Sequence, residues 1–134
     1  MATLFTRIAK GEIPSYKVAE DDNYYAFLDI SPLAKGHTLV IPKNVEDDYI
    51  FNLDESTYAG LWAFARKVAA AIKAAVPCKR VGVAVLGMEV PHTHIHLVPL
   101  QTEGDLDFRK ARPEVTPEEQ AQIAKSISSE YEKL

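Results

Sequence analysis

The 134-residue chain has little of what marks secreted, membrane-spanning or nucleic-acid-binding proteins. Its one cysteine, Cys78, excludes a disulfide within the chain. It has neither an apolar run near the roughly 20 residues that span a bilayer nor the apolar N-terminal segment of a signal peptide. Its formal net charge is -4, whereas a surface that wraps a nucleic-acid backbone needs excess positive charge. We therefore expect a cytoplasmic protein that binds neither membrane nor nucleic acid.

The composition predicts a single folded domain covering residues 1–134. Hydrophobic residues make up 47% and charged residues 25% of the chain, values usual for globular proteins. This length is sufficient to bury one core of ordinary size. Internal repeats and low-complexity tracts are absent.

Turn-forming residues divide the chain into short segments. The hydrophobic pattern predicts a short helix over 5–9 and strands over 16–19, 24–29, 37–41, 81–86 and 92–99. Asp54 is a candidate N-cap for a long helix that continues to about Val76, and Thr116 opens a capping box for a C-terminal helix. Short consecutive strands joined by tight turns predict an antiparallel sheet of about five strands with helices on one side, an α+β fold.

Three of the four histidines fall within five positions, at His92, His94 and His96. Side chains on a strand alternate between faces, so the three imidazoles share one face, about 6.6 Å apart at roughly 3.3 Å per residue. The intervening Thr93 and Ile95 lie on the other face, which is apolar enough to pack on a core. The pattern therefore predicts a row of imidazoles on a rigid element.

Surface histidines, a metal site and catalysis by imidazole are all compatible with this row. Two of the three rings could bind one zinc ion, with a further ligand from His37, Cys78 or a carboxylate. All three could not, because the first and third rings start about 13 Å apart, whereas zinc–nitrogen bonds are about 2.0 to 2.1 Å long. Neither a Cys-x-x-Cys nor a His-Glu-x-x-His pattern is present. In catalysis, one imidazole would be the nucleophile and its neighbours hydrogen-bond donors and proton carriers.

The run from His92 to Val98 resembles the signature of the histidine triad (HIT) family, in which histidines alternate with mostly apolar residues. Residues 26–32 and 36–43 resemble the nucleoside-binding half of that family. The resemblance covers roughly residues 4–100, followed by a C-terminal extension and helix over about 101–134. Two motif blocks in the right order favour catalysis over surface histidines and zinc. The resemblance implies a HIT-like fold, a homodimer whose sheet continues across the subunits, and a hydrolase or transferase that acts on nucleotide α-phosphates without a metal or other cofactor.

The resemblance also implies a role for each histidine. His94 would attack the α-phosphate through Nε2, while its Nδ1 proton is held by the backbone carbonyl of His92. A neutral imidazole has a free lone pair and needs no separate base for this attack. Water would then hydrolyse the nucleotidyl-histidine intermediate. His96 would contact the phosphoryl oxygens and the leaving group, and His92 and His37 would support the row of rings.

The nucleoside is expected to lie against Phe5, Ile8, Phe27 and Ile30, with Asp29 accepting from the ribose hydroxyls. These assignments come from the resemblance. The residues alone leave two alternatives open, in which the apolar side chains belong to the core and Asp29 caps the turn that follows it.

The segment before the triad departs from the family pattern Gly-Gln-x-Val-x-His. Gly87 and Val90 match the pattern and, with Glu89, are expected at the nucleotide site. Met88 replaces the amide, Glu89 stands where a hydroxyl residue is frequent, and the preceding loop lacks an Asn and is shorter. These positions bear on the leaving group. A phosphoramidase, a dinucleoside polyphosphate hydrolase, a nucleotidyl transferase and a nucleotide-binding regulatory protein with incidental turnover therefore all remain open.

Overall fold

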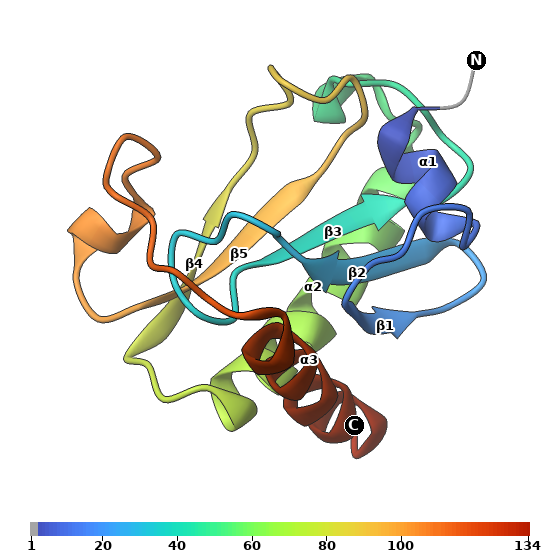
Figure 1. Cartoon of the computed structure of the whole chain (residues 1–134). Helices are drawn as coiled ribbons and strands as arrows, with labels where there is room; N and C mark the ends of the chain where they lie inside the picture. Colours follow the sequence, from blue (N-terminus) through green and yellow to red (C-terminus); the bar gives the residue numbers. More distant parts are fainter. Residues whose placement is uncertain (1–2) are drawn as a thin grey trace.

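The computed structural model describes residues 3–134 and has the α+β architecture that the sequence predicts (Figure 1). Its strands are β1 (Lys17–Glu20), β2 (Tyr24–Leu28), β3 (Thr38–Pro42), β4 (Arg80–Ala84) and β5 (Ile95–Leu100). Its helices are α1 (Leu4–Ala9), α2 (Glu55–Ala75) and α3 (Pro117–Glu132). Two short 3-10 helices, η1 (Ile50–Asn52) and η2 (Glu103–Leu106), were not expected from the hydrophobic pattern.

The five strands form one antiparallel sheet in the order β1-β2-β3-β5-β4. The chain therefore leaves the sheet after β3, passes through α2, and returns at the edge strand β4 before β5 fills the place between them. Leu39 of β3 lies opposite His96 of β5, so these two side chains share a face of the sheet. Ile95 and Leu97 lie on the other face.

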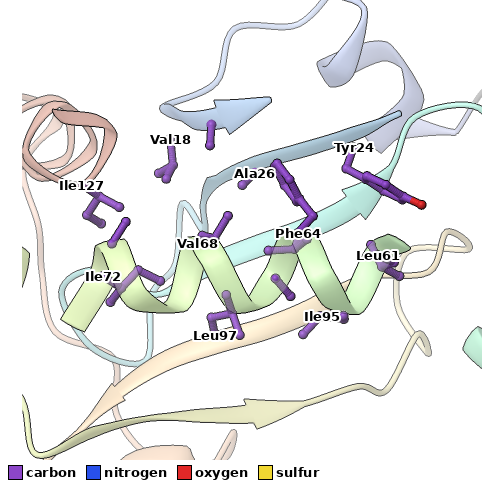
Figure 2. Close-up of a cluster of buried hydrophobic side chains, with 14 of the residues drawn as sticks. Val18, Tyr24, Ala26, Leu61, Phe64, Val68, Ile72, Ile95, Leu97 and Ile127 are labelled. Atoms are coloured by element: carbon purple, nitrogen blue, oxygen red, sulfur yellow. The ribbon is translucent and has the colours of Figure 1, made fainter. Parts of the chain in front are cut away.

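Helices α2 and α3 cover that other face of the sheet and bury the main core (Figure 2). Asp54 caps α2 by accepting from the backbone N–H of Thr57, and Thr116 and Glu119 form the predicted capping box of α3. Apolar residues at helical spacing on α2 pack against Val40, Ile95 and other inward-facing strand residues. The buried core residues of α2 are Leu61, Phe64, Ala65, Val68, Ala71 and Ile72.

The opposite face carries a smaller apolar cluster covered by α1, so the expectation of helices on one side of the sheet is wrong: Phe5 and Ile8 of this short helix bury the second face. The cluster contains two α1 residues, and strand residues that alternate with those of the main core, as the two-residue period of a strand requires. The members are Phe5, Ile8, Tyr25, Phe27, Leu39 and Ile41. Because His96 lies on this face, the smaller cluster is the floor on which the candidate site is built.

The predicted strand over 92–99 is wrong at its N-terminal end, because β5 begins only at Ile95. The backbone N–H of Thr93 donates to the carbonyl of Asp47 (2.8 Å), and that of His92 to the carbonyl of Val90 (2.7 Å). These hydrogen bonds tie the segment to loops rather than to β3. Only His96 therefore lies on a strand, while His92 and His94 precede it.

Among the described residues, no helix has the length and apolar character needed to cross a membrane.

Candidate active site

The four histidines of the chain lie together on the α1 side of the sheet and are all buried. His37 directly precedes β3 and His96 lies on β5, while His92 and His94 come from the segment leading into β5. Their exposed fractions are 0% for His37 and His92, 6% for His94 and 7% for His96. The rings of His94 and His96 are 4.9 Å apart between centroids, closer than the spacing expected for a flat row on one strand. The cluster predicted from sequence is present, although only part of it lies on a strand.

Backbone carbonyls fix the protons of His94 and His92. His94 Nδ1 lies 2.7 Å from the carbonyl oxygen of His92, and because a carbonyl only accepts, Nδ1 carries the proton. In the neutral ring, Nε2 then has a free lone pair. His92 Nε2 similarly donates to the carbonyl of Pro42 (2.8 Å), so its Nδ1 accepts from the Thr3 hydroxyl (2.7 Å). The expected contact between His94 and the His92 carbonyl is therefore present in the structure.

A backbone N–H fixes the protons of the other two rings. The N–H of Leu33 donates to His37 Nδ1 (3.0 Å), so the proton of neutral His37 is on Nε2. That Nε2–H lies 3.0 Å from His96 Nδ1 and donates to it. The proton of neutral His96 is therefore on Nε2. The site places a lone pair on His94 beside a ring that presents an N–H donor.

Burial keeps these rings neutral. It lowers the pKa of His37 from 6.5 to about 3 and that of His96 to about 4, with the neighbouring histidines and the Arg112 guanidinium acting in the same direction. Burial also lowers the pKa of His94, against the opposing effects of its hydrogen bond to the His92 carbonyl and of Asp29 and Glu89. Because His37 is neutral near pH 7, its 3.7 Å contact with the Asp29 carboxylate is not an ion pair.

A cavity of about 300 Å³ opens on one side of His94 and His96. It is lined by all five residues expected to hold the nucleoside, and by Glu89 and Val90. Phe5, Ile8 and Phe27 are almost fully buried members of the smaller apolar cluster, so they are both core and cavity floor. Phe5 also packs edge-on against the His94 ring, 5.0 Å away. Ile30 differs from these three, because it is 85% exposed at the rim.

Asp29 takes part in the turn as well as in the cavity. Its Oδ1 accepts from the backbone N–H of Ser31 (2.8 Å), which is the turn cap that the sequence left open. Its Oδ2 accepts no hydrogen bond from residues 3–134, and the side chain lines the first cavity. Burial raises the pKa of this carboxyl, partly offset by the Ser31 N–H and by Arg112. Asp29 can therefore cap its turn with one oxygen and offer the other to a ligand.

A second cavity, of about 200 Å³, also reaches His94 and His96. Gly87 lines this cavity and not the first, and Glu89 lines both. Gly87 has a φ of +72°, and an added Cβ would lie 2.5 Å from the Asp48 carbonyl, so a side chain is excluded there.

Sequence reasoning missed two side chains of the second cavity, Phe108 and Arg112. They lie in the irregular segment between η2 and α3, drawn in orange in Figure 1. The run from Phe108 to Arg112 combines one aromatic with three basic residues, Arg109 and Lys110 being the other two. This was the local signal that could have identified the segment.

Among residues 3–134, the group best arranged to hold a metal is Asp29, His37 and His96, whose ligand atoms lie within 4.8 Å of one another. This group contains only one histidine of the triad, His96, whereas the zinc site that the sequence allowed would use two of the three triad histidines. His37 Nε2 and His96 Nδ1 are already hydrogen-bonded to each other, so an ion would have to displace that proton.

Comparisons with known proteins agree with this geometry. A HIT domain model matches residues 10–103. Adenosine 5'-monophosphoramidase HNT1 of Saccharomyces cerevisiae is 35% identical over 103 residues, 76% of this chain and 65% of the yeast protein. A hypothetical histidine triad nucleotide-binding protein of Sulfolobus tokodaii superposes with a TM-score of 0.79 at 34% identity, covering 97% of this chain and 92% of that one. A zinc-bound histidine triad family protein of Mycobacterium smegmatis gives 0.80 at 26% identity, covering 99% and 95%. The chain therefore belongs to the HIT domain family.

Proposed function

We propose that the protein is a nucleotide-binding hydrolase that cleaves a bond at the α-phosphate of a nucleotide, of the phosphoramidate or dinucleoside polyphosphate type. One observation carries the proposal: His94 presents a lone pair and His96 an N–H donor at the point shared by two cavities. A nucleoside fits the apolar first cavity, and the second leaves room for a leaving group. The HIT family and the name of the yeast relative support the same kind of substrate.

The first step forms a bond between His94 Nε2 and the α-phosphorus. The bond from phosphorus to the leaving group breaks, and the leaving group departs with the electron pair and takes up a proton from solvent. The Nδ1 proton of His94 stays on the ring, where the His92 carbonyl stabilises the positive charge that the attack creates. His96 Nε2–H donates to a phosphoryl oxygen as negative charge builds there.

The second step releases the nucleoside monophosphate. A water oxygen attacks phosphorus, the phosphorus–nitrogen bond breaks, and His94 Nε2 recovers its lone pair. One proton of the water returns to solvent, which balances the proton taken up in the first step. The scheme uses imidazoles, a backbone carbonyl and water.

A panel of substrates tests this function. The purified protein is incubated with adenosine and guanosine phosphoramidates, dinucleoside polyphosphates and sugar nucleotides, and release of the monophosphate is followed by chromatography. We expect release from at least one phosphoramidate or dinucleoside polyphosphate. Rapid acid-free quenching should also trap phosphorus on a base-stable, acid-labile linkage, as expected for phosphohistidine. No release from any member would contradict the proposal and leave nucleotide binding as the function.

We also propose that the protein is a homodimer joined through β4. This strand is an edge of the sheet, with unpaired backbone groups on its outer side. Val83 on β4 is 45% exposed and Leu86 just beyond it 54% exposed, which suits a covered rather than a free edge. Light scattering on a size-exclusion column should give twice the chain mass. Val83→Lys should shift it toward the monomer, and an unshifted dimer would place the interface elsewhere.

A further inference from the structure

The segment between η2 and α3 follows the triad in the sequence, whereas the nucleoside motifs precede it, and its Phe108 contacts the rings of His96 and His37. The Phe108 ring packs edge-on against His96, 4.8 Å between centroids, and also approaches His37 at 6.3 Å. Arg112 lies over the Phe108 ring at 5.9 Å and lines the same cavity as His94 and His96. An aromatic face and a cation therefore flank the leaving-group side of the candidate site.

The Arg112 guanidinium is held in place but is not neutralised. Its NH1 donates to the carbonyl of Ser31, and its NH2 to the carbonyl of Phe108 (3.2 Å). These bonds use two of its five N–H donors. Among residues 3–134 no carboxylate lies within the 4.0 Å of an ion pair with it, although neighbouring Arg109 is paired with Asp107. Arg112 is also half-buried, so its charge is less screened than that of a surface arginine.

The charge of Arg112 acts on three titratable groups of the site. It contributes to the lowered pKa of His37 and His96, and it opposes the effect of burial on the pKa of Asp29. Arg112 is fixed, has free N–H donors and lies beside the cavity that contains His94. Such a guanidinium can donate two parallel hydrogen bonds to the oxygens of a carboxylate or a phosphate.

We propose that Phe108 and Arg112 form a leaving-group subsite that selects substrates whose leaving group carries an acidic group, a carboxylate or a phosphate. This inference rests on the proposed function, because it assigns the second cavity to the leaving group. Arg112 pairs with the acid while Phe108 packs against the adjoining carbons. Glu89 lines the same cavity and disfavours an acid placed beside it, which adds to the preference for the position beside Arg112.

Three adenosine 5'-phosphoramidates test the subsite, with glycine, glycinamide and 2-aminoethyl phosphate as leaving amines. Glycine and glycinamide differ in the charge of one group, and aminoethyl phosphate separates phosphate from carboxylate. We measure kcat/KM for the wild type, Arg112→Gln and the control Arg109→Gln, whose side chain belongs to the same segment but lies exposed at the surface. Thermal unfolding and binding of adenosine monophosphate establish that each variant is folded.

The wild type should prefer at least one acidic leaving group over glycinamide by about 10- to 100-fold, the effect of one charge-assisted hydrogen-bonded pair. Arg112→Gln should remove that preference and retain turnover of glycinamide, while Arg109→Gln should change neither. Which acid is preferred identifies the leaving group as carboxylate or phosphate.

Two results would overturn the inference. If Arg112→Gln lowers kcat/KM equally for all three substrates, Arg112 contacts the α-phosphate rather than the leaving group. If the wild type hydrolyses substrates with acidic and neutral amines at equal rates, the cavity does not select the leaving group by charge. Either outcome leaves the proposed hydrolase intact. Absence of turnover on all three substrates would instead contradict both the subsite and the phosphoramidate form of the proposed function, while release from a dinucleoside polyphosphate in the wider panel would still support a hydrolase.

Discussion

The two cavities that meet at His94 and His96 are built in different ways. The first rests on buried side chains of α1, β2 and β3 that also form an apolar cluster, so its shape is part of the folded core. The second is lined by Gly87, Met88 and Glu89 and by the irregular segment that carries Phe108 and Arg112. A substitution among the buried apolar residues of the first disturbs the core, whereas a substitution of the exposed Met88 or Glu89 in the second mainly changes ligand binding. We expect the nucleoside side to be uniform among relatives and the leaving-group side to differ.

The largest effect is expected where the two cavities meet. His94→Ala removes the lone pair that attacks phosphorus, so turnover should fall at least about a thousandfold while monophosphate binding and folding persist. Single-turnover kinetics and calorimetric titration with the monophosphate measure the two properties separately. A variant that retains near-wild-type hydrolysis would contradict the covalent mechanism.

The buried rings between the cavities should make the fold sensitive to acid. The pKa of His37 is about 3 and that of His96 about 4 in the folded protein, both below the usual 6.5. The unfolded chain therefore takes up protons first as the pH falls. Each ring should lower the free energy of unfolding by about 1.4 kcal/mol per pH unit between roughly pH 6 and pH 4.

Urea denaturation at several pH values measures this slope. His37→Gln should reduce the dependence of the free energy of unfolding on pH by the contribution of one histidine, about 1.4 kcal/mol per pH unit. An unchanged slope would mean that His37 is not the group that resists protonation.

On the nucleoside side, Asp29→Asn should weaken ribonucleotide binding by about 1.5 to 3 kcal/mol, the scale of a hydrogen bond to a charged group. The substitution preserves an oxygen to cap the turn at Ser31. Titration with a 2',3'-dideoxynucleotide is the control, and its affinity should change much less. Equal losses for both ligands would show that Asp29 serves only the turn.

On the leaving-group side, Glu89→Ser should raise hydrolysis of a simple nucleoside phosphoramidate only severalfold. A carboxylate about 6 Å from a phosphate opposes binding by a few kcal/mol at an effective dielectric near 20, but Glu89 is exposed and solvent screens most of this effect. The salt dependence of kcat/KM should weaken together with the rise in rate. Asp22→Ser, an exposed acid in the turn between β1 and β2, is the charge-matched control. If neither rate nor salt dependence changes in Glu89→Ser, this carboxylate does not face the phosphate.

The smallest effect is expected from exhaustive chelation, which should leave turnover essentially unchanged, because the proposed scheme places imidazoles where a metal would otherwise stabilise charge. Activity before and after dialysis against a strong chelator measures this. Loss on chelation with recovery by zinc would instead assign a role to the cluster of Asp29, His37 and His96.

Local patterns predicted most of the fold, and the resemblance to the HIT family predicted the residues of the first cavity. Asp54 and Thr116 cap their helices because capping depends on residues three positions apart, and periodicity placed Ile95 and Leu97 in the core. The N-terminal end of β5 could not be predicted, because the backbone N–H of Thr93 donates to the carbonyl of Asp47, which lies in a loop 46 residues away. Phe108 and Arg112 were missed for the same reason. Their position depends on the path that an irregular segment takes back to the sheet, and no periodic pattern of hydrophobic residues predicts such a path.

The hydrogen bonds that begin at Leu33 have a direction. A peptide N–H can only donate, so the Leu33 N–H in the loop before β3 requires His37 to accept at Nδ1 and to carry its proton on Nε2. His37 then donates to His96 Nδ1, so His96 also carries its proton on Nε2. The proton that faces the substrate is thus specified by backbone geometry in the loop before β3, not by acidity. A loop conformation in which Nδ1 of His37 carried the proton would move the proton of His96 as well, and would remove the N–H donor from the site without altering any of its side chains.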